Sequence, residues 1–405
     1  MTRSVKPKLS LAEFIALIAV LFATIALSID AMLPALPQIA AELSPDDPNL
    51  AQLVITSFVF GMGVGTLFVG PLSDTFGRKP VILFGSLLYA IAALICFIAP
   101  SLETLLAARA VQGIGTAAAR VVAVAMVRDQ FAGRDMARIM SFVMMVFMVV
   151  PAAAPLMGAA VIAVTGWREI FLVYVIFAAA TSFWLWSRQP ETLAPEDRRP
   201  LSAGVLWKAV GEVLSHRIVV ISILAQSLTL GMLFASLSSM QAIFEQRFDR
   251  AESFPYWFAF IALASMLGSM LNSQIVMRLG MRRVVVAAYL AKLILTLCVF
   301  LVNASGALPE VLAFPLHIVW TSCLFAMLGL TMGNLNAMAM EPLGHIAGLA
   351  ASVITSISTV ASVILAVPIG LMFDGTAIPL MAGVAVYGAL AWMLVRYGTV
   401  ERAPA

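Results

Sequence analysis

Long uninterrupted apolar runs restrict the fold of this sequence more than any other feature. Twelve of them are long enough for membrane-spanning helices, and short loops rich in Gly, Pro and charged residues separate them. They cover residues 11–40, 50–70, 80–99, 103–128, 137–163, 169–187, 217–243, 255–278, 284–303, 310–340, 347–373 and 377–396. Apolar residues make up 62% of the 405 and charged residues 11%. The sequence therefore predicts an all-α membrane protein and excludes a soluble enzyme.

Basic residues are distributed unevenly between the two sides of the predicted bundle. Eighteen of the 24 Lys and Arg residues lie in loops on one side, three lie on the other side, and three lie within the runs. Because cytoplasmic loops carry the excess of basic residues, we expect a multi-pass inner-membrane protein with both termini in the cytoplasm. The cations form no single patch, so no nucleic-acid partner is expected. We expect a monomer.

The longest polar stretch, residues 188–216, divides the runs into two sets of six. It begins as a Pro-rich charged linker and continues as a segment with apolar residues on one helical face, which predicts a helix on the cytoplasmic surface. The expected domains are thus a six-helix bundle (1–187), this linker (188–216) and a second six-helix bundle (217–405). Paired bundles with a site at their interface are a transporter architecture.

No energy-converting motif occurs in the chain. There is no GxxxxGK[ST] loop for a nucleotide, and neither GxSxG nor HExxH is present. The three His and three Cys residues lack metal-ligand spacing. We therefore expect no enzyme activity, no metal and no cofactor, and any transport work has to come from an ion gradient.

Asp30 is the acidic residue that lies deepest in an apolar run. It is about ten residues, or ~15 Å, from the outer end of the first run. A charge there costs roughly 2.5–3.5 kcal/mol, so it should face a cavity or a partner. Arg109 in the fourth run lies at a similar depth and is the expected partner. Two interpretations remain open: a static ion pair between helices, or a coupling pair in which conformation switches the proton occupancy of Asp30.

Other polar or adaptable side chains within the runs are candidates for substrate contacts, although such groups more often bond between helices. The candidates are Gln112, Arg120, Met145, Gln226 and Asn334. Lys292 either lines a cavity or extends to the membrane surface. Gly61 and Gly65 are expected to allow close packing of helices.

The loop after the second run reads Gly-Pro-Leu-Ser-Asp-Thr-Phe-Gly-Arg-Lys-Pro over residues 70–80. It resembles the signature loop of the major facilitator superfamily, G-x-L-x-D-x-x-G-R-K-P. In that family the Asp and the basic residues form a conformational latch on the cytoplasmic side. The resemblance implies this role for Gly70, Asp74, Gly77, Arg78 and Arg128, and Asp74 could lie at a helix N-terminus.

Further stretches resemble the drug:proton antiporters of that superfamily. Residues 109–115 are similar to a fourth-span motif whose Arg is tied to proton transfer. Pro151, Pro155 and Gly158 resemble the fifth-span antiporter motif, which shapes the bundle interface against leak, although Ala154 departs from the fuller pattern. Residues 28–37, 166–171 and 341–348 look like the bicyclomycin-resistance (Bcr/CflA) branch.

The resemblance implies the major facilitator fold and proton-coupled efflux of small amphipathic drugs or antibiotics, driven by the proton gradient. The expected partners are a small-molecule substrate, protons and the lipid bilayer. Some multidrug relatives carry a carboxylate where this chain has Phe22, which argues against strongly cationic drugs and favours neutral or weakly polar substrates here. The alternatives are an exporter of an endogenous sugar, amino acid derivative or siderophore, or a receptor or scaffold that does not transport.

Overall fold

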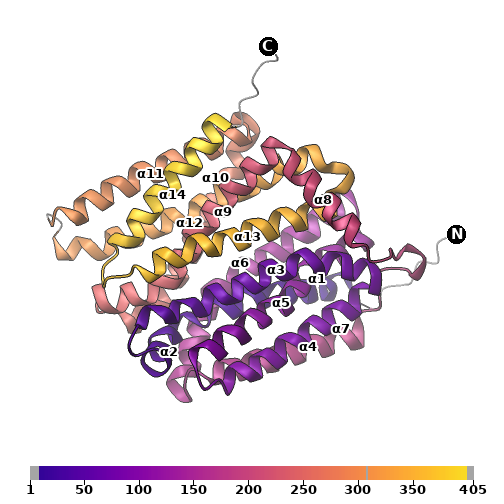
Figure 1. Ribbon diagram of the computed structural model, residues 1–405, viewed down its shortest axis with the longest axis horizontal. Coiled ribbons are helices and arrows are strands. Elements are labelled where there is room, and N and C mark those ends of the chain that lie inside the picture. Colours follow the sequence, from indigo (N-terminus) through magenta and orange to yellow (C-terminus); the bar gives the residue numbers. More distant parts are fainter. Residues whose placement is uncertain (1–8, 307–308, 399–405) are drawn as a thin grey trace, which may run out of the picture.

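The computed structural model describes residues 9–306 and 309–398, and these residues form helices and loops without a strand (Figure 1). This confirms the all-α fold. The long helices are α1 (Leu11–Asp30), α3 (Leu53–Phe76), α4 (Arg78–Phe97), α5 (Leu102–Gln130), α6 (Gly133–Val164), α7 (Glu169–Arg188), α9 (Arg217–Ala242), α10 (Phe254–Leu279), α11 (Met281–Ala304), α12 (Glu310–Met340), α13 (Ala347–Leu371) and α14 (Ile378–Gly398). Two shorter helices are α2 (Leu36–Leu43) and α8 (Ala203–Ser215).

Eleven segments of the described chain are long and apolar enough to cross a membrane. One of them, Glu310–Leu371, has 62 residues and contains both α12 and α13, which a 3-10 segment at Glu341–Ile346 separates. Pro342 lies in this segment, and Leu343 has non-helical backbone angles. The described residues therefore contain the twelve spans that the apolar runs predict.

The helices form two layers, with α1 and α3–α7 in one and α9–α14 in the other (Figure 1). We call them the first and the second bundle. Between the bundles, α3 packs against α13 and α6 packs against α10. Helices α8 and α2 lie at opposite ends of the molecule in Figure 1.

We call the end that carries α8 the arginine-rich end, because nearly all loops between helices at this end are basic. The described basic residues there are Arg78, Lys79, Arg128, Arg134, Arg138, Arg188, Arg198, Arg199, Lys208, Arg217, Arg278, Arg282, Arg283 and Arg396. Arg3, Lys6, Lys8 and Arg402, which the sequence assigns to the same side, lie outside the described residues.

Helix α8 forms where the linker was expected to be helical. Ser202 caps its first turn by accepting a hydrogen bond from the backbone N–H of Val205. Leu206 and Val213 are buried, and the helix packs against α9 and α13. Trp207 remains exposed. The helix thus covers the ends of the second bundle with one face and leaves apolar side chains on another.

Glycines bring α3 and α5 into direct backbone contact, as expected from Gly61 and Gly65. A Cβ atom at Gly61 would overlap the carbonyl group of Ala110, and one at Gly65 would meet the Cβ of Ala117 at 2.9 Å. Without side chains at these positions the two backbones approach closely, which is how helices associate where water does not drive them together.

Replacing Gly61 by Ala should lower the free energy of unfolding by about 1–3 kcal/mol, because the added methyl group meets backbone that cannot move aside. The matched control is Gly388→Ala in α14, where the new methyl group enters open space. The thermal unfolding midpoint in detergent micelles measures both changes. Equal midpoints for the two variants would contradict the packing described here.

Candidate functional site

Helix α1 ends at Asp30 for a reason that the sequence contains. Pro34 has no N–H group to donate to the carbonyl of Asp30, four residues earlier, and its ring crowds that carbonyl, which favours a break of the α-helix here. The chain tightens into a 3-10 turn at Leu33–Ala35. In this transition the N–H of Met32 bonds the carbonyl of Ile29 at 3.3 Å. The carbonyl of Ser28, its normal helical acceptor, is therefore left for other donors.

Arg109 of α5 uses that freed carbonyl. Its Nη2 donates to the carbonyl oxygen of Ser28 at 2.9 Å, and its Nε donates to the carbonyl oxygen of Val54 at 3.2 Å. Its Nη1 donates to Oε1 of Gln112 at 2.6 Å, and the guanidinium lies 4.4 Å from the ring centre of Phe58. The side chain is fully buried. One guanidinium thus joins α1, α3 and α5.

The expected ion pair between Asp30 and Arg109 is not formed. Asp30 is 5% exposed, and within residues 9–306 and 309–398 its carboxylate has neither a cation nor a hydrogen-bond donor as a partner. The physical reason is that oxygens fixed by three helices already occupy the donors of Arg109. The two residues are linked through the backbone of α1 instead, and a role in proton coupling stays a prediction.

Two tyrosines that the sequence analysis did not single out hold the same part of α1. The hydroxyl of Tyr89 in α4 lies 2.7 Å from Oγ of Ser28. The hydroxyl of Tyr174 in α7 donates to the carbonyl oxygens of Leu27 and Ser28 at 3.2 and 3.4 Å. The available signal was a tyrosine within each of two largely apolar runs. Polar groups from α4, α5 and α7 therefore converge on the helix end that carries Asp30.

The fifth-span motif packs beside this helix end. A Cβ atom at Gly158 of α6 would overlap the carbonyl oxygen of Ala31, the residue after Asp30. Pro151 and Pro155 lie inside α6, which continues through both. Because α6 also packs against α10, it connects the end of α1 with the second bundle.

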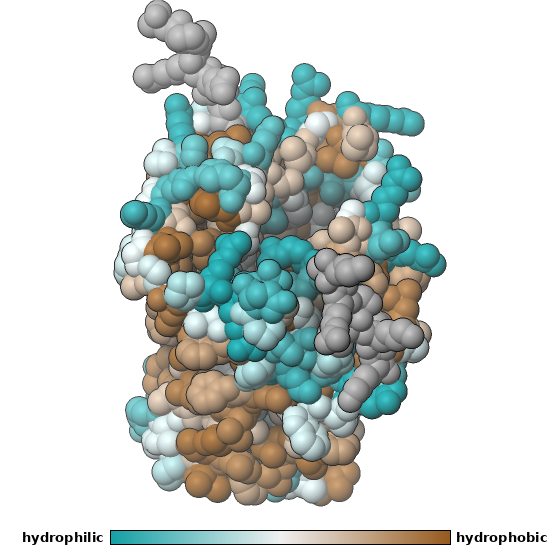
Figure 2. All heavy atoms as spheres, turned by 90° about the vertical axis from the view of Figure 1, so that its right-hand side faces the viewer, coloured by the Kyte–Doolittle hydropathy of each residue, from teal (hydrophilic) through white to brown (hydrophobic). Residues whose placement is uncertain are grey.

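A cavity of about 810 Å³ lies between the bundles at the arginine-rich end. Figure 2 looks onto this end, where hydrophilic side chains gather. Helices α3, α5 and the linker line one side, and α12, α13 and the segment between them line the other. The polar lining residues are Thr66, Ser73, Asp74, Arg78, Arg120, Arg128, Asp129, Asp197, Arg199, Asn336, His345, Ser352 and Thr355.

Among the expected substrate contacts, Arg120 lines this cavity, and its side chain is exposed within it. The other four do not line it. Asn334 donates from Nδ2 to Oδ1 of Asn272 at 2.8 Å, which joins α12 to α10. The amide nitrogens of Gln112 and Gln226 are buried and have no hydrogen-bond partner among the residues that the structure describes. Met145 is 57% exposed on α6. Any substrate contact of these four residues stays a prediction.

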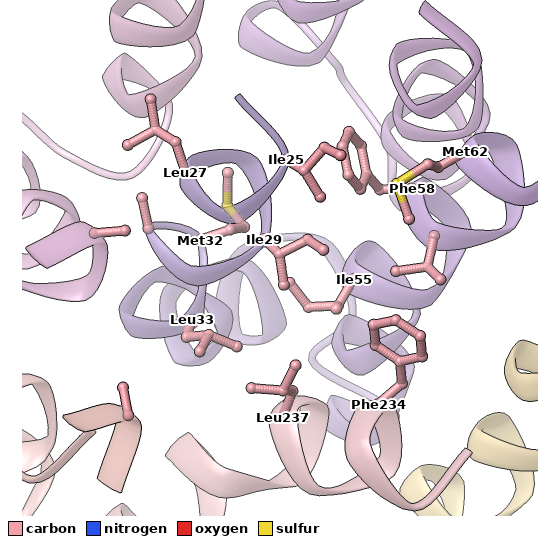
Figure 3. Close-up of a cluster of buried hydrophobic side chains, with 14 of the residues drawn as sticks. Ile25, Leu27, Ile29, Met32, Leu33, Ile55, Phe58, Met62, Phe234 and Leu237 are labelled. Carbon is pink, nitrogen blue, oxygen red and sulfur yellow. The ribbon is translucent and has the colours of Figure 1, made fainter. Parts of the chain in front are cut away.

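The opposite end of the molecule is closed by apolar side chains from both bundles. Figure 3 shows Phe234 and Leu237 pointing from α9 toward Ile55 of α3 and Ile29 of α1. All four are buried. We call this group of four the apolar seal. It separates the cavity from the end that carries α2.

Polar contacts reinforce the closure at the end that carries α2. Nδ2 of Asn49 donates to the carbonyl oxygens of Leu371 and Phe373 at 3.2 and 2.9 Å. Oγ of Ser239 in α9 donates to Oε1 of Gln52 at 3.1 Å. These bonds connect the first bundle to the second.

The signature loop forms a charge cluster around Arg78, which is itself buried. Arg78 pairs with Asp74, donates from Nη1 to Oγ of Ser73 at 2.8 Å, and donates from Nε to Oδ2 of Asp129 at 2.9 Å. Arg128, expected in this latch, lies beside Gly348 of the second bundle and lines the same cavity as Asp74 and Arg78, and its role in a latch stays a prediction. Asp129 was missed by the sequence analysis, although it adjoins Arg128 at the end of the same run.

The carboxylate at the start of α4 comes from Glu191 of the linker, not from Asp74, which lies in the last turn of α3. The backbone N–H groups of Arg78 and Lys79 donate to its Oε1 and Oε2 at 2.9 and 3.1 Å. These are N–H groups that the helix itself leaves unsatisfied. Gly77, with φ +102°, makes the turn and leaves room for this carboxylate.

Lys292 of α11 is a second buried cation. It neither lines the cavity nor extends to the surface, and it is 4% exposed. Its Nζ donates to the carbonyl oxygen of Trp320 at 2.7 Å and lies 4.2 Å from the centre of that ring. In the part of the chain that the structure describes, it has no acidic partner.

Comparison with known proteins gives consistent matches. The family model of the Major Facilitator Superfamily matches residues 17–366. The uncharacterized MFS-type transporter YdgK of Bacillus subtilis is 30% identical over 400 residues, which cover 96% of this chain and 95% of that protein. The bicyclomycin resistance protein homolog of Haemophilus influenzae is 34% identical over 263 residues, which cover 62% of this chain and 63% of that protein.

Among solved structures, the crystal structure of a D-xylose-proton symporter superimposes with a TM-score of 0.76. The alignment covers 97% of this chain and 99% of that chain, at 15% sequence identity. At this identity the likeness shows the fold.

Replacing Glu191 by Ala should lower the free energy of unfolding by about 0.5–2 kcal/mol, because two N–H groups at the start of α4 lose their acceptor. The matched control is Glu196→Ala, an exposed carboxylate of the same linker. Thermal unfolding in detergent measures both. If the control destabilises as much as Glu191→Ala, the assigned cap is wrong.

Proposed function

The chain belongs to the major facilitator superfamily, and on this premise we propose that it exports small amphipathic compounds in exchange for protons. The observation that carries this proposal is Asp30, an acid buried without a partner at the break of α1. An ionised carboxylate is costly in such a site, so it exchanges its proton only when a conformation gives it access to water. In each conformation water reaches this acid from only one side of the membrane. The acid therefore takes up a proton on one side and releases it on the other, which couples proton movement to the conformational change.

The orientation follows from the basic loops. With the arginine-rich end in the cytoplasm of a bacterial cell, the cavity opens inward and the apolar seal closes the outside. Asp30 is buried and does not line the cavity, so in this proposal substrate binds after a rearrangement has let Asp30 release its proton to water on the cytoplasmic side. The bundles then rock, the seal opens, and a proton from outside neutralises Asp30. The return step delivers this proton to the cytoplasm. In this proposal the chain works as a monomer without a cofactor.

The proton gradient supplies enough energy for this exchange. One proton that crosses 100 mV releases about 2.3 kcal/mol. At about 1.4 kcal/mol per tenfold ratio, this maintains roughly a forty-fold gradient of a neutral compound. The similarity to a bicyclomycin resistance protein homolog supports antibiotics as substrates.

Asp30→Asn should abolish uphill transport, because an amide cannot carry the proton. Proteoliposomes with an imposed pH gradient and bicyclomycin as the probe measure this. We expect accumulation to fall to the level of protein-free vesicles, while exchange down the substrate gradient continues. Asp46→Asn, an exposed acid in the loop after α2, is the control and should transport normally. Uphill transport and substrate-induced proton release that persist in Asp30→Asn would refute the proposal.

A cross-link across the closed end should stop transport, because the seal has to open in each cycle. Gln52 and Ser239 are in hydrogen-bond contact across the bundles. The shorter cysteine side chains in Gln52→Cys and Ser239→Cys should therefore be joined by a short, reducible bis-methanethiosulfonate reagent. The exposed Cys298 and Cys323 are replaced by Ser beforehand. We expect loss of transport in the cross-linked double variant and recovery with a reductant, while each single variant stays active. Full activity of the cross-linked protein would contradict alternating access at this end.

A further inference from the structure

Resting on the proposed export function, we propose that the preferred substrates carry an acidic group and that Arg120 binds it in the central cavity. This names the substrate class as amphipathic monoanions. It replaces the expectation of neutral substrates. The expectation rested on Phe22, and the lack of a carboxylate there argues against cationic substrates but not against anionic ones.

Arg120 is a cation placed deep in the cavity without a counter-charge. It lies ten residues before the end of α5 at Gln130, or ~15 Å from the arginine-rich end. Its side chain is exposed in the cavity, and no described residue forms an ion pair or a hydrogen bond with it. The guanidinium therefore has its five N–H groups available to a ligand.

The acids that line the cavity do not neutralise Arg120. Asp74 and Asp129 both pair with Arg78. Asp129 is nine residues further along α5 than Arg120, or ~14 Å along the helix axis. Asp197 belongs to the linker at the mouth. The inner part of the cavity thus has a net positive charge.

The cations that line the cavity differ from Arg120 in their surroundings. Arg78 is paired with Asp74 and Asp129. Arg128 lies in the last turn of α5, eight residues nearer the arginine-rich end than Arg120, and Arg199 belongs to the linker at that end. Arg109 is fully buried among oxygens and does not line the cavity. Among the cations that line the cavity, Arg120 is therefore the one best placed to bind an anion. Its guanidinium can donate two parallel N–H hydrogen bonds to a carboxylate.

The remaining lining suits the rest of an amphipathic molecule. Its apolar residues are Val121, Val124, Ala125, Leu193, Ile346, Ala347, Leu349 and Ala351. A volume of about 810 Å³ is within the range of sites for drug-sized ligands. An amphipathic monoanion fits this cavity, because its apolar part can contact these residues while its carboxylate binds Arg120.

The proposal has a consequence for energetics. Export of a neutral compound against one proton moves one charge, whereas export of a monoanion against one proton moves two. At 100 mV the sustainable gradient rises from roughly forty-fold to roughly two-thousandfold. Transport of the acid should therefore respond more steeply to membrane potential than transport of its ester.

Binding to the purified full-length protein tests the site. The probes are 1-pyrenebutyrate, nalidixate and fusidate, each compared with its methyl ester by isothermal titration. Arg120→Gln should weaken binding of the acids by about ten- to a hundredfold and leave the esters within about twofold. Arg120→Lys should recover part of the affinity. Arg283→Gln, an exposed cation of α11 outside the cavity, is the control and should bind as the unaltered protein does.

The outcomes separate this inference from the export function. If none of the acids binds, or if Arg120→Gln weakens acid and ester equally, the inference is overturned, while ester transport that requires Asp30 still supports proton antiport. If the acids bind through Arg120 but no pH gradient drives their transport, the export function fails and the anion site stands. The thermal unfolding midpoints of both Arg120 variants show whether a loss of binding reflects misfolding.

Discussion

The need to solvate a charge inside an apolar bundle determines how the first bundle is built around Arg109. A guanidinium has five N–H groups, and lipid offers them no acceptor. Protein oxygens have to accept from them, and those of Ser28, Val54 and Gln112 accept one hydrogen bond from each of the three nitrogens. The oxygen of Ser28 is available because α1 stops before Pro34. The break in α1, the position of Asp30 at the last residue before it and the burial of Arg109 therefore depend on one another.

The second bundle solves the same problem with different groups. Lys292 has one carbonyl oxygen and the face of the Trp320 ring, and the indole Nε1 donates in turn to Thr296 at 3.1 Å. In both bundles a buried cation is stabilised by a backbone carbonyl and an aromatic ring rather than by an acid. Neither of these two buried cations pairs with Asp30, the acid that lies deep within a span.

The sequence predicts those features that depend on neighbours along the chain. The twelve spans follow from run length, and the breaks that the structure shows near Pro34 and Pro342 have a local cause, because a proline has no N–H group to donate. The sequence fails where the partner is remote. Depth along a helix is known from its rise per residue, but the direction of a side chain around the helix is not, so Asp30 and Arg109 could be matched in depth and still not meet. Glu191 reaches α4 because the linker folds back, which no local pattern indicates.

The absence of the direct ion pair changes how substrate and proton can be coupled. Arg109 and Arg120 are eleven residues apart on α5, or about three turns, so they lie on the same face of one helix. Arg120 faces the cavity, and Arg109 holds the carbonyl of Ser28, two residues before Asp30. A shift of α5 on substrate binding would move both arginines together and would alter the bonds that fix the end of α1. The proposed coupling then passes through a rigid helix and a backbone carbonyl, and Asp30 needs no charged partner to respond.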